Sequence, residues 1–192
     1  MPSLSIAEVL PPPETCLVLR TARRADLDAL VALEHAAFVT DRAERRAIRH
    51  AVDSPTMDVI VALVEEAGEV LVGAAVLERR RSSRIARLSS IAVAPGRSGL
   101  GIGGRLLAAA EVEAGARGCD RLRLEVRADN GAGIRLYERR GYVRFAVRPD
   151  YYEDGMEAWR YEKAIAPAQH PGAIAGGRRG GHAAAARRAR TD

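Results

Sequence analysis

A short glycine-rich segment carries the clearest binding chemistry in this chain of 192 residues. Residues 99–104 read Gly-Leu-Gly-Ile-Gly-Gly, and they lie between an apolar run that ends at Val93 and a segment with the apolar spacing of a helix. A glycine loop that opens a helix presents several backbone N–H groups, and the positive end of the helix dipole, to an anion. The pattern therefore predicts a phosphate-binding loop.

Two other interpretations of the glycine segment stay open. It also matches the G-x-G-x-x-G fingerprint of dinucleotide-binding oxidoreductases, with Glu125 as a possible ribose-binding acid. However, five residues separate Val93 from Gly99, whereas that fingerprint needs glycine almost directly after the strand. The glycines could also serve only turns and packing, although such a cluster costs helix stability. A Walker loop is excluded because the only lysine is Lys163.

Glu125 is the candidate for acid–base chemistry. Apolar and charged residues alternate through 120–128, which is typical of a half-buried strand, and Glu125 falls on its polar face. A carboxylate in this position can act as a general base. The alternative is an ordinary ion pair with Arg123 or Arg127.

The elements that must position these residues follow from the hydrophobic spacing. Glycine or polar breaks separate the apolar runs, and three Val- and Ile-rich runs in the middle of the chain have the spacing of an antiparallel meander. Strands are predicted at 16–22, 57–66, 69–80, 84–93, 120–128, 142–148 and 157–165, and helices at 26–38, 41–52, 105–118 and 133–142. The expected fold class is a mixed α/β arrangement with a mainly antiparallel sheet flanked by helices.

The chain divides into an arm, one domain and a tail. Residues 1–14 include three consecutive prolines and are expected to form a flexible arm. Residues 15–165 have enough apolar content for a single domain. Residues 166–192 are rich in Ala, Gly and Arg, with few large apolar side chains, and are expected to be disordered.

The formal net charge of +5 belongs mostly to the tail. Five arginines and one acid lie beyond Ala164, which leaves 25 bases and 24 acids in residues 1–163. A nucleic-acid-binding domain needs a dense positive field on its folded surface, so the near-neutral body argues against that class. The tail alone could contact nucleic acid or the ribosome.

Targeting and metal-binding signals are weak in this sequence. No uncharged apolar run approaches the ~18 residues of a spanning helix, and the first residues lack the basic region of a secretory signal, so we expect a cytoplasmic protein. The cysteines and histidines are isolated from one another, which predicts unpaired thiols and no metal site. These residues are Cys16, Cys119, His35, His50, His170 and His182.

Two longer motifs connect the glycine loop with Glu125. The segment SSIAVAPGRSGLGIGGRLLAAAE, followed by RLRLEVRADNGAGIRLYERRGY, resembles the GNAT superfamily of acetyl-CoA-dependent N-acetyltransferases, and the resemblance covers residues 16–163. Within it, LEVRADN, LYERRGY and RPDYYEDGMEAW are most similar to the RimI-type protein Nα-acetyltransferases. The resemblance implies a sheet with splayed central strands and direct transfer of acetyl from acetyl-CoA to an amine, without a metal.

The resemblance also implies a set of cofactor-binding residues. The pantetheine arm of acetyl-CoA would lie along the backbone of Ile91, Ala92 and Val93, and Asn130 would bind the same arm. The pyrophosphate would lie on the loop amides, contributed by Gly99, Leu100, Gly101, Ile102, Gly103 and Gly104. Ser98 stands where the family has Gln or Arg, with Arg97 displaced by one residue.

The acceptor side is implied in the same way. Glu125 would be the base, through a water, and Tyr137 the acid, unless Tyr137 is a plain core aromatic. Tyr151 and Tyr152 would bind the backbone of a peptide acceptor, the α-amine of a protein N-terminus, and the nearby acids could attract its charge. Residues 38–46, the other expected substrate wall, do not resemble the RimI-type loop, so a small-molecule amine remains the alternative acceptor. The protein is expected to be a monomer or a homodimer.

Overall fold

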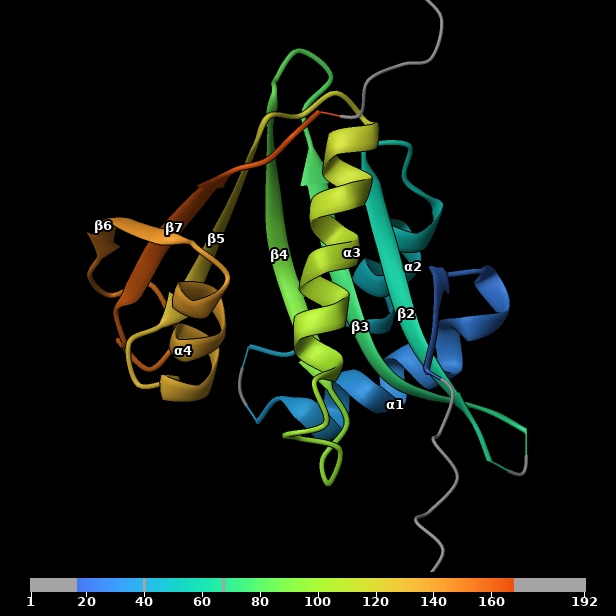
Figure 1. The fold of residues 1–192 in the computed structure, drawn as a ribbon. Coiled ribbons are helices and arrows are strands. Elements are labelled where there is room, and N and C mark those ends of the chain that lie inside the picture. The colour runs from blue at the N-terminus through green and yellow to red at the C-terminus, as the bar shows by residue number, and fades with distance from the viewer. Residues whose placement is uncertain (1–16, 40, 67, 168–192) are drawn as a thin grey trace, which may run out of the picture.

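A seven-stranded sheet organises the molecule, in the order β1-β2-β3-β4-β5-β7-β6 (Figure 1). The computed structural model describes residues 17–39, 41–66 and 68–167. The predictions for the arm at residues 1–14, for Cys16 and for residues 168–192 of the tail lie outside the described residues. The strands are β1 (Leu17–Thr21), β2 (Met57–Glu65), β3 (Glu69–Arg79), β4 (Ile85–Val93), β5 (Arg121–Arg127), β6 (Val143–Arg148) and β7 (Ala158–Ala164).

The predicted fold class is confirmed. Strands β1 to β4 form an antiparallel meander, β5 runs parallel to β4, and β7 lies between β5 and the edge strand β6. A dinucleotide-binding domain needs a mainly parallel sheet, so this topology excludes the oxidoreductase interpretation of the glycine loop. The loop itself starts after Val93 and leads into a helix at Ile102, too far from the strand for that fingerprint.

Four α-helices and one 3-10 turn are seen in the described residues: η1 (Arg24–Asp26), α1 (Leu27–Ala37), α2 (Arg45–Asp53), α3 (Ile102–Ala116) and α4 (Gly131–Arg139). The prediction of a helix from residue 41 was wrong at its start, because Asp41 adopts a left-handed backbone with φ of 54°. Helix α3 begins three residues earlier than predicted, directly after Gly101, whose φ is 76°. No helix in these ranges is long and apolar enough to cross a membrane.

Each face of the sheet packs against one pair of helices (Figure 1). Helices α3 and α4 cover one face, where Leu106 and Leu107 are fully buried against strand residues such as Leu77. Helices α1 and α2 cover β2 and β3 on the opposite face, through Leu30 and Leu33. The result is a three-layer arrangement with two separate cores.

Cys119 belongs to the first of these cores. Its side chain is 1% exposed, and it makes no disulfide with any described residue. Burial raises the pKa of its thiol, so the group stays protonated at neutral pH. A protonated and buried thiol cannot act as a nucleophile.

The strands β4 and β5 separate at the centre of the sheet. They pair only from Ile85 with Arg121 to Leu88 with Leu124, and Figure 1 shows them diverging beyond that point. Ser89 has no partner in the β3–β4 register, which is the mark of a β-bulge. The edge of β4 that faces β5 therefore has unpaired backbone groups after Leu88. The splayed strands expected from the resemblance are confirmed.

Candidate active site

A cavity of about 730 Å³ lies beside the point where β4 and β5 separate. Its inner wall is apolar and comes from α1, α2, β2 and β3, with Leu33, Phe38, Ile48, Met57, Val59 and Val76 among its members. Its other wall is polar and includes Glu34, Asp41, Glu78, Glu125, Arg127 and Asp154. Its five carboxylates are matched by three arginines, because Arg87 and Arg160 pair with Glu78 and Glu125 from outside the lining, so a small excess of acid remains to favour a cation.

Glu125 and Tyr137 both line this cavity. Glu125 comes from β5 and Tyr137 from the second turn of α4, so a strand, a loop and a helix together position the two side chains. Tyr137 is 5% exposed, and burial raises the pKa of its hydroxyl. The hydroxyl therefore stays protonated near neutral pH and can donate a proton.

Two arginines hold the Glu125 carboxylate. Arg87 Nε donates to one oxygen at 2.8 Å and Arg160 Nε donates to the other at 3.2 Å, while the glutamate side chain is 10% exposed. The predicted alternative partners, Arg123 and Arg127, were wrong, because each pairs with another acid. The reason is cross-strand pairing: Arg160 lies directly opposite Glu125 in the β5–β7 register, closer than residues two apart on one strand.

This arrangement orients the carboxylate without using all of its acceptor capacity. A carboxylate has about four lone-pair sites, and the arginines take two of them. A water in the cavity can therefore bridge Glu125 and an incoming amine.

The β4 backbone forms the side of the cavity where strands diverge. Ser89, Ser90, Ile91 and Ala92 line the cavity, whereas Val93 does not. Ile91 and Ala92 pair with β3 on one side only, so an extended ligand can bind along the other side with strand-like hydrogen bonds.

The predicted phosphate loop has the geometry of an anion site, although it lies outside the cavity lining. Gly99 and Gly101 both have left-handed backbones, with φ of 83° and 76°. Residues other than glycine rarely adopt this conformation. Helix α3 begins at Ile102, and the first N–H groups of a helix have no partner within it. Its first turn is therefore available to a phosphate.

Arg140 is a residue at this loop that sequence reasoning missed. Arg97 donates to Glu66 and Arg105 donates to the Leu17 carbonyl, so both nearby arginines are already engaged. Arg140 ends α4 and lies against the first turn of α3, where a Cβ on Gly104 would come within 2.9 Å of its Nη2. Across the described ranges Arg140 has no ion pair. The only signal in the sequence was Gly104, because a glycine inside a helix often marks a place where another group comes close.

Asn130 lies between the cavity and the start of α4. Its Oδ1 accepts a hydrogen bond from the Gly133 amide at 2.9 Å, which caps the helix. Position 133 favours glycine because a Cβ there would lie 2.9 Å from Nδ2 of Asn130. The side-chain amide lines the cavity and can donate to a ligand.

The adjacent tyrosines Tyr151 and Tyr152 differ in whether they line the cavity. Tyr152 lines the cavity, and burial raises the pKa of its hydroxyl to about 12. Tyr151 does not line it, and its hydroxyl accepts a hydrogen bond from Arg87 at 2.9 Å. Their rings meet edge to face with centroids 5.1 Å apart. Of the nearby acids only Asp154 reaches the cavity, and Glu157 accepts from the Trp159 indole.

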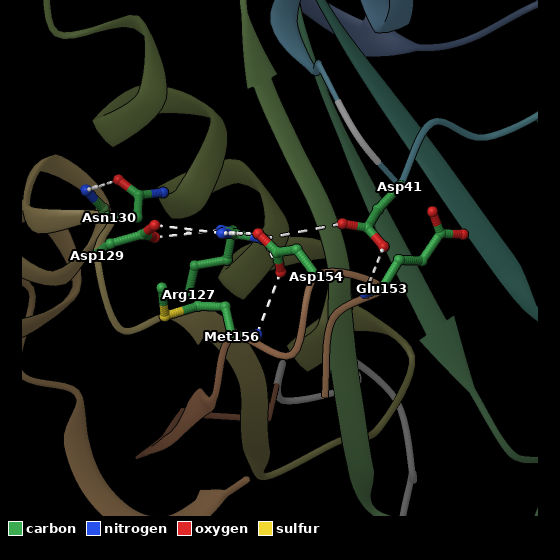
Figure 2. A network of polar contacts seen from close by, with 8 residues as sticks. Asp41, Arg127, Asp129, Asn130, Glu153, Asp154 and Met156 are labelled. Atoms are coloured by element: carbon green, nitrogen blue, oxygen red, sulfur yellow. Dashed lines mark hydrogen bonds and ion pairs between the residues drawn. The ribbon is translucent and has the colours of Figure 1, made fainter. Parts of the chain in front are cut away.

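A polar network lies on the side of the cavity where the α1–α2 and β6–β7 loops meet, which we call the cavity mouth. Figure 2 shows Arg127 at its centre, with Asp129 on one side and Asp154 and Asp41 on the other. The guanidinium makes hydrogen bonds to Asp129 and Asp154 and lies 3.9 Å from Asp41. The three acids come from three different loops.

The splayed sheet and the glycine loop that opens α3 agree with the resemblance seen in the sequence. The model described as the acetyltransferase (GNAT) family matches residues 25–142. The chain belongs to this family. GNAT acetyltransferases use acetyl-CoA, and this protein is an acetyl-CoA-dependent N-acetyltransferase.

Solved structures place the chain near both protein and small-molecule acetyltransferases. The ribosomal-protein-S18-alanine N-acetyltransferase from Escherichia coli is 26% identical, with a TM-score of 0.69 over 81% of this chain and 98% of that one. Ard1 from Thermoplasma volcanium is 26% identical, with a TM-score of 0.67 over 78% and 97%. Nourseothricin acetyltransferase is also 26% identical, with a TM-score of 0.64 over 79% and 99%. The search of curated proteins found no match.

Proposed function

We propose that this GNAT enzyme acetylates the α-amine of a protein or peptide N-terminus. The observation that carries the proposal is that Glu125 and Tyr137 line one cavity beside the unpaired edge of β4. A base and an acid on either side of a reacting carbonyl are the groups that acetyl transfer requires. The similarity to the Escherichia coli alanine N-acetyltransferase supports the peptide assignment.

The residues present fit acetyl-CoA. The free edge of β4 from Ile91 to Val93 suits the amide groups of the pantetheine arm, and Asn130 can donate to the same arm. The amides of residues 99–104 suit the pyrophosphate, and Arg140 adds the cation that Ser98 does not supply. Acetyl-CoA brings a thioester whose carbonyl carbon accepts the amine.

The proton balance assigns a role to each side chain. The amine nitrogen forms a bond to the carbonyl carbon, and its surplus proton passes through a water to Glu125. The carbon–sulfur bond breaks, and the thiolate takes the proton of the Tyr137 hydroxyl. Arg87 and Arg160 keep the carboxylate in place during this exchange.

The cavity's two walls favour an acceptor with an apolar group next to its amine. The carboxylates of Glu34, Asp41 and Glu78 attract an ammonium, and the apolar wall formed by α1 and α2 accepts a side chain such as that of a first residue. Tyr152 then forms the wall beside the peptide backbone.

A small-molecule amine is the second candidate acceptor. The acid-rich polar wall suits a polycationic compound, and the similarity to nourseothricin acetyltransferase is equal in identity. Such an acceptor would use the carboxylates but leave the apolar wall unoccupied, which favours the peptide.

A panel of acceptors tests the proposal. Peptides with free N-termini and varied first residues, the same peptides with blocked N-termini, and small cationic amines are incubated with acetyl-CoA and read by mass spectrometry. We expect acetylation of free N-termini only, with apolar first residues preferred. Modification of small amines without any peptide would overturn the peptide assignment.

Replacing Glu125 with Gln tests the proposed base. Turnover should fall mainly on the acidic side of the pH profile, because there the acceptor is an ammonium that must lose one proton before it attacks and another afterwards, whereas at high pH only the second proton remains to be removed. The Glu162→Gln variant, which changes an acid on β7 outside the cavity lining, is the control and should keep the wild-type profile. A wild-type profile for Glu125→Gln would remove Glu125 from the mechanism.

A further inference from the structure

The mouth of the cavity is held by a single cation. Arg127 ends β5, and its side chain is one quarter exposed. It forms two hydrogen bonds with Asp154, at 3.1 and 2.7 Å, and two with Asp129, at 3.1 and 3.2 Å. Its guanidinium also lies 4.8 Å from the centre of the Tyr152 ring. Four hydrogen bonds from one fork fix its position in a way that a lysine could not.

The contacts of Arg127 connect segments that are distant in sequence. Asp41 lies in the loop between α1 and α2, and its carboxylate is 3.9 Å from the Arg127 guanidinium. Asp154 lies in the loop between β6 and β7. A second contact joins these loops directly, because the Glu153 amide donates to Asp41 at 3.4 Å (Figure 2).

Arg127 is the shared ion-pair partner of the three aspartates around it. Within residues 17–39, 41–66 and 68–167, none of Asp41, Asp129 and Asp154 has another ion-pair partner. Glu125 differs, because it keeps a second arginine if either one is removed. Without Arg127, three like charges would face one another across the cavity mouth.

We infer that Arg127 is the positioning residue that holds the α1–α2 and β6–β7 loops together and so sets the affinity for the acceptor. Arg127, Asp41 and Asp154 all line the cavity, so a change in their spacing changes the width of its mouth. The unpaired edge of β4 and the glycine loop are separate from this network. The inference rests on the proposed function in one respect, that the cavity holds the acceptor.

The kinetic test compares Arg127→Met with Arg121→Met, a control on the same strand whose partner Glu162 keeps Arg123. We expect the KM for the best peptide of the panel to rise about tenfold or more in Arg127→Met, as for loss of a coupled contact. The KM for acetyl-CoA should rise less, because the network meets that site only at Asp129, which is next to Asn130. Arg121→Met should match the wild type in both constants.

A second substitution separates charge from general loss of structure. Adding Asp41→Asn to Arg127→Met removes one of the facing charges but keeps an oxygen for the Glu153 amide. We expect this double variant to recover part of the acceptor affinity. Arg127→Lys should lie between wild type and Arg127→Met, because it keeps the charge and loses the fork. It also serves as the test variant if Arg127→Met fails to fold.

Hydrogen exchange tests the inference without any acceptor. In Arg127→Met, or in Arg127→Lys to a smaller degree, amides of residues 41–44 and 151–156 should exchange about tenfold faster or more, with α3 unchanged. Equal rises in both KM values, unchanged exchange in the two loops, or no recovery from Asp41→Asn would overturn the inference. If no peptide in the panel is acetylated, the proposed function fails, and the exchange result still decides the role of Arg127.

Discussion

Two tyrosines in contact provide a direct test of the proposed acid. The rings of Tyr137 and Tyr142 meet edge to face with centroids 5.9 Å apart, and both side chains are buried. The Tyr137 residue lines the cavity, whereas the Tyr142 hydroxyl is buried with no hydrogen-bond partner in the described chain. The substitutions Tyr137→Phe and Tyr142→Phe therefore remove the same atom from two different surroundings.

The two variants should separate turnover from stability. Tyr142→Phe removes a buried hydroxyl that makes no hydrogen bond of ordinary geometry, although Glu111 lies close enough to help raise its pKa. The free energy of unfolding should therefore stay the same or rise by at most the desolvation cost of about 1–3 kcal/mol, and turnover should not change. Tyr137→Phe loses no hydrogen bond within the described residues, so stability should stay within about 0.5 kcal/mol. If its hydroxyl protonates the thiolate, turnover should fall by roughly 10²–10⁴.

Steady-state kinetics with acetyl-CoA, combined with denaturant unfolding, measure both effects. Because burial raises the pKa of Tyr137, the wild-type rate should not fall through loss of this acid until the pH is above about 10, the ordinary value for a tyrosine. Wild-type turnover in Tyr137→Phe would refute the assignment of the acid. A Tyr142→Phe variant that loses activity as strongly would show that the pair acts through packing.

Two further substitutions test the cofactor side and the packing beneath it. Arg140→Met should raise the Kd for acetyl-CoA about tenfold or more by isothermal titration, because charge-assisted bonds to phosphate are worth about 1.5–3 kcal/mol, whereas Arg139→Met should not. Gly73→Ala should lower the free energy of unfolding by about 1–3 kcal/mol, because its Cβ would lie 2.9 Å from the Leu106 side chain and 3.0 Å from a β4 carbonyl oxygen. Gly103→Ala, with no contact closer than 3.5 Å, is the control for stability and should be tolerated.

Local patterns were sufficient to predict the helices, the strands and the antiparallel meander. Val- and Ile-rich runs separated by short polar breaks gave the antiparallel meander, and the predicted strand ends differ from the observed ones by at most one residue. The predicted start of α2 was wrong for a physical reason. Residues 41–44 read Asp-Arg-Ala-Glu, which is compatible with a helix, but Asp41 adopts a left-handed backbone and takes part in the network at the cavity mouth. Tertiary contacts decide such a boundary.

The partners of the site residues could not be predicted in the same way. The pairing of Glu125 with Arg160 depends on β7 lying between β5 and β6, which no local spacing encodes. Arg87 reaches Glu125 because β4 and β5 are parallel neighbours at that level. The motif resemblance placed Glu125 and Tyr137 in a common site, and both line one cavity of the structure, while their catalytic roles remain predictions.

The position of Arg140 beside the glycine loop also could not be predicted from local sequence patterns. A sequence motif records only the residues of one segment, and the loop at 99–104 has Ser98 where the family has Gln or Arg. The packing of α4 against α3 brings in a cation from more than thirty residues away. A departure within a motif therefore does not predict weak binding unless the neighbouring elements are known.

The many arginines of the body have a structural explanation. On β5, Arg121 and Arg123 pair with Glu162, and Arg127 pairs with acids of the adjoining loops. Such arginines add little net charge because each is matched by a carboxylate, which agrees with the near-neutral body of the chain. Lack of an acid does not by itself single out an arginine, because Arg42, Arg105 and several others also make no ion pair in the described residues. Position does: Arg140 lies against the first turn of α3, the helix end that a phosphate is expected to occupy.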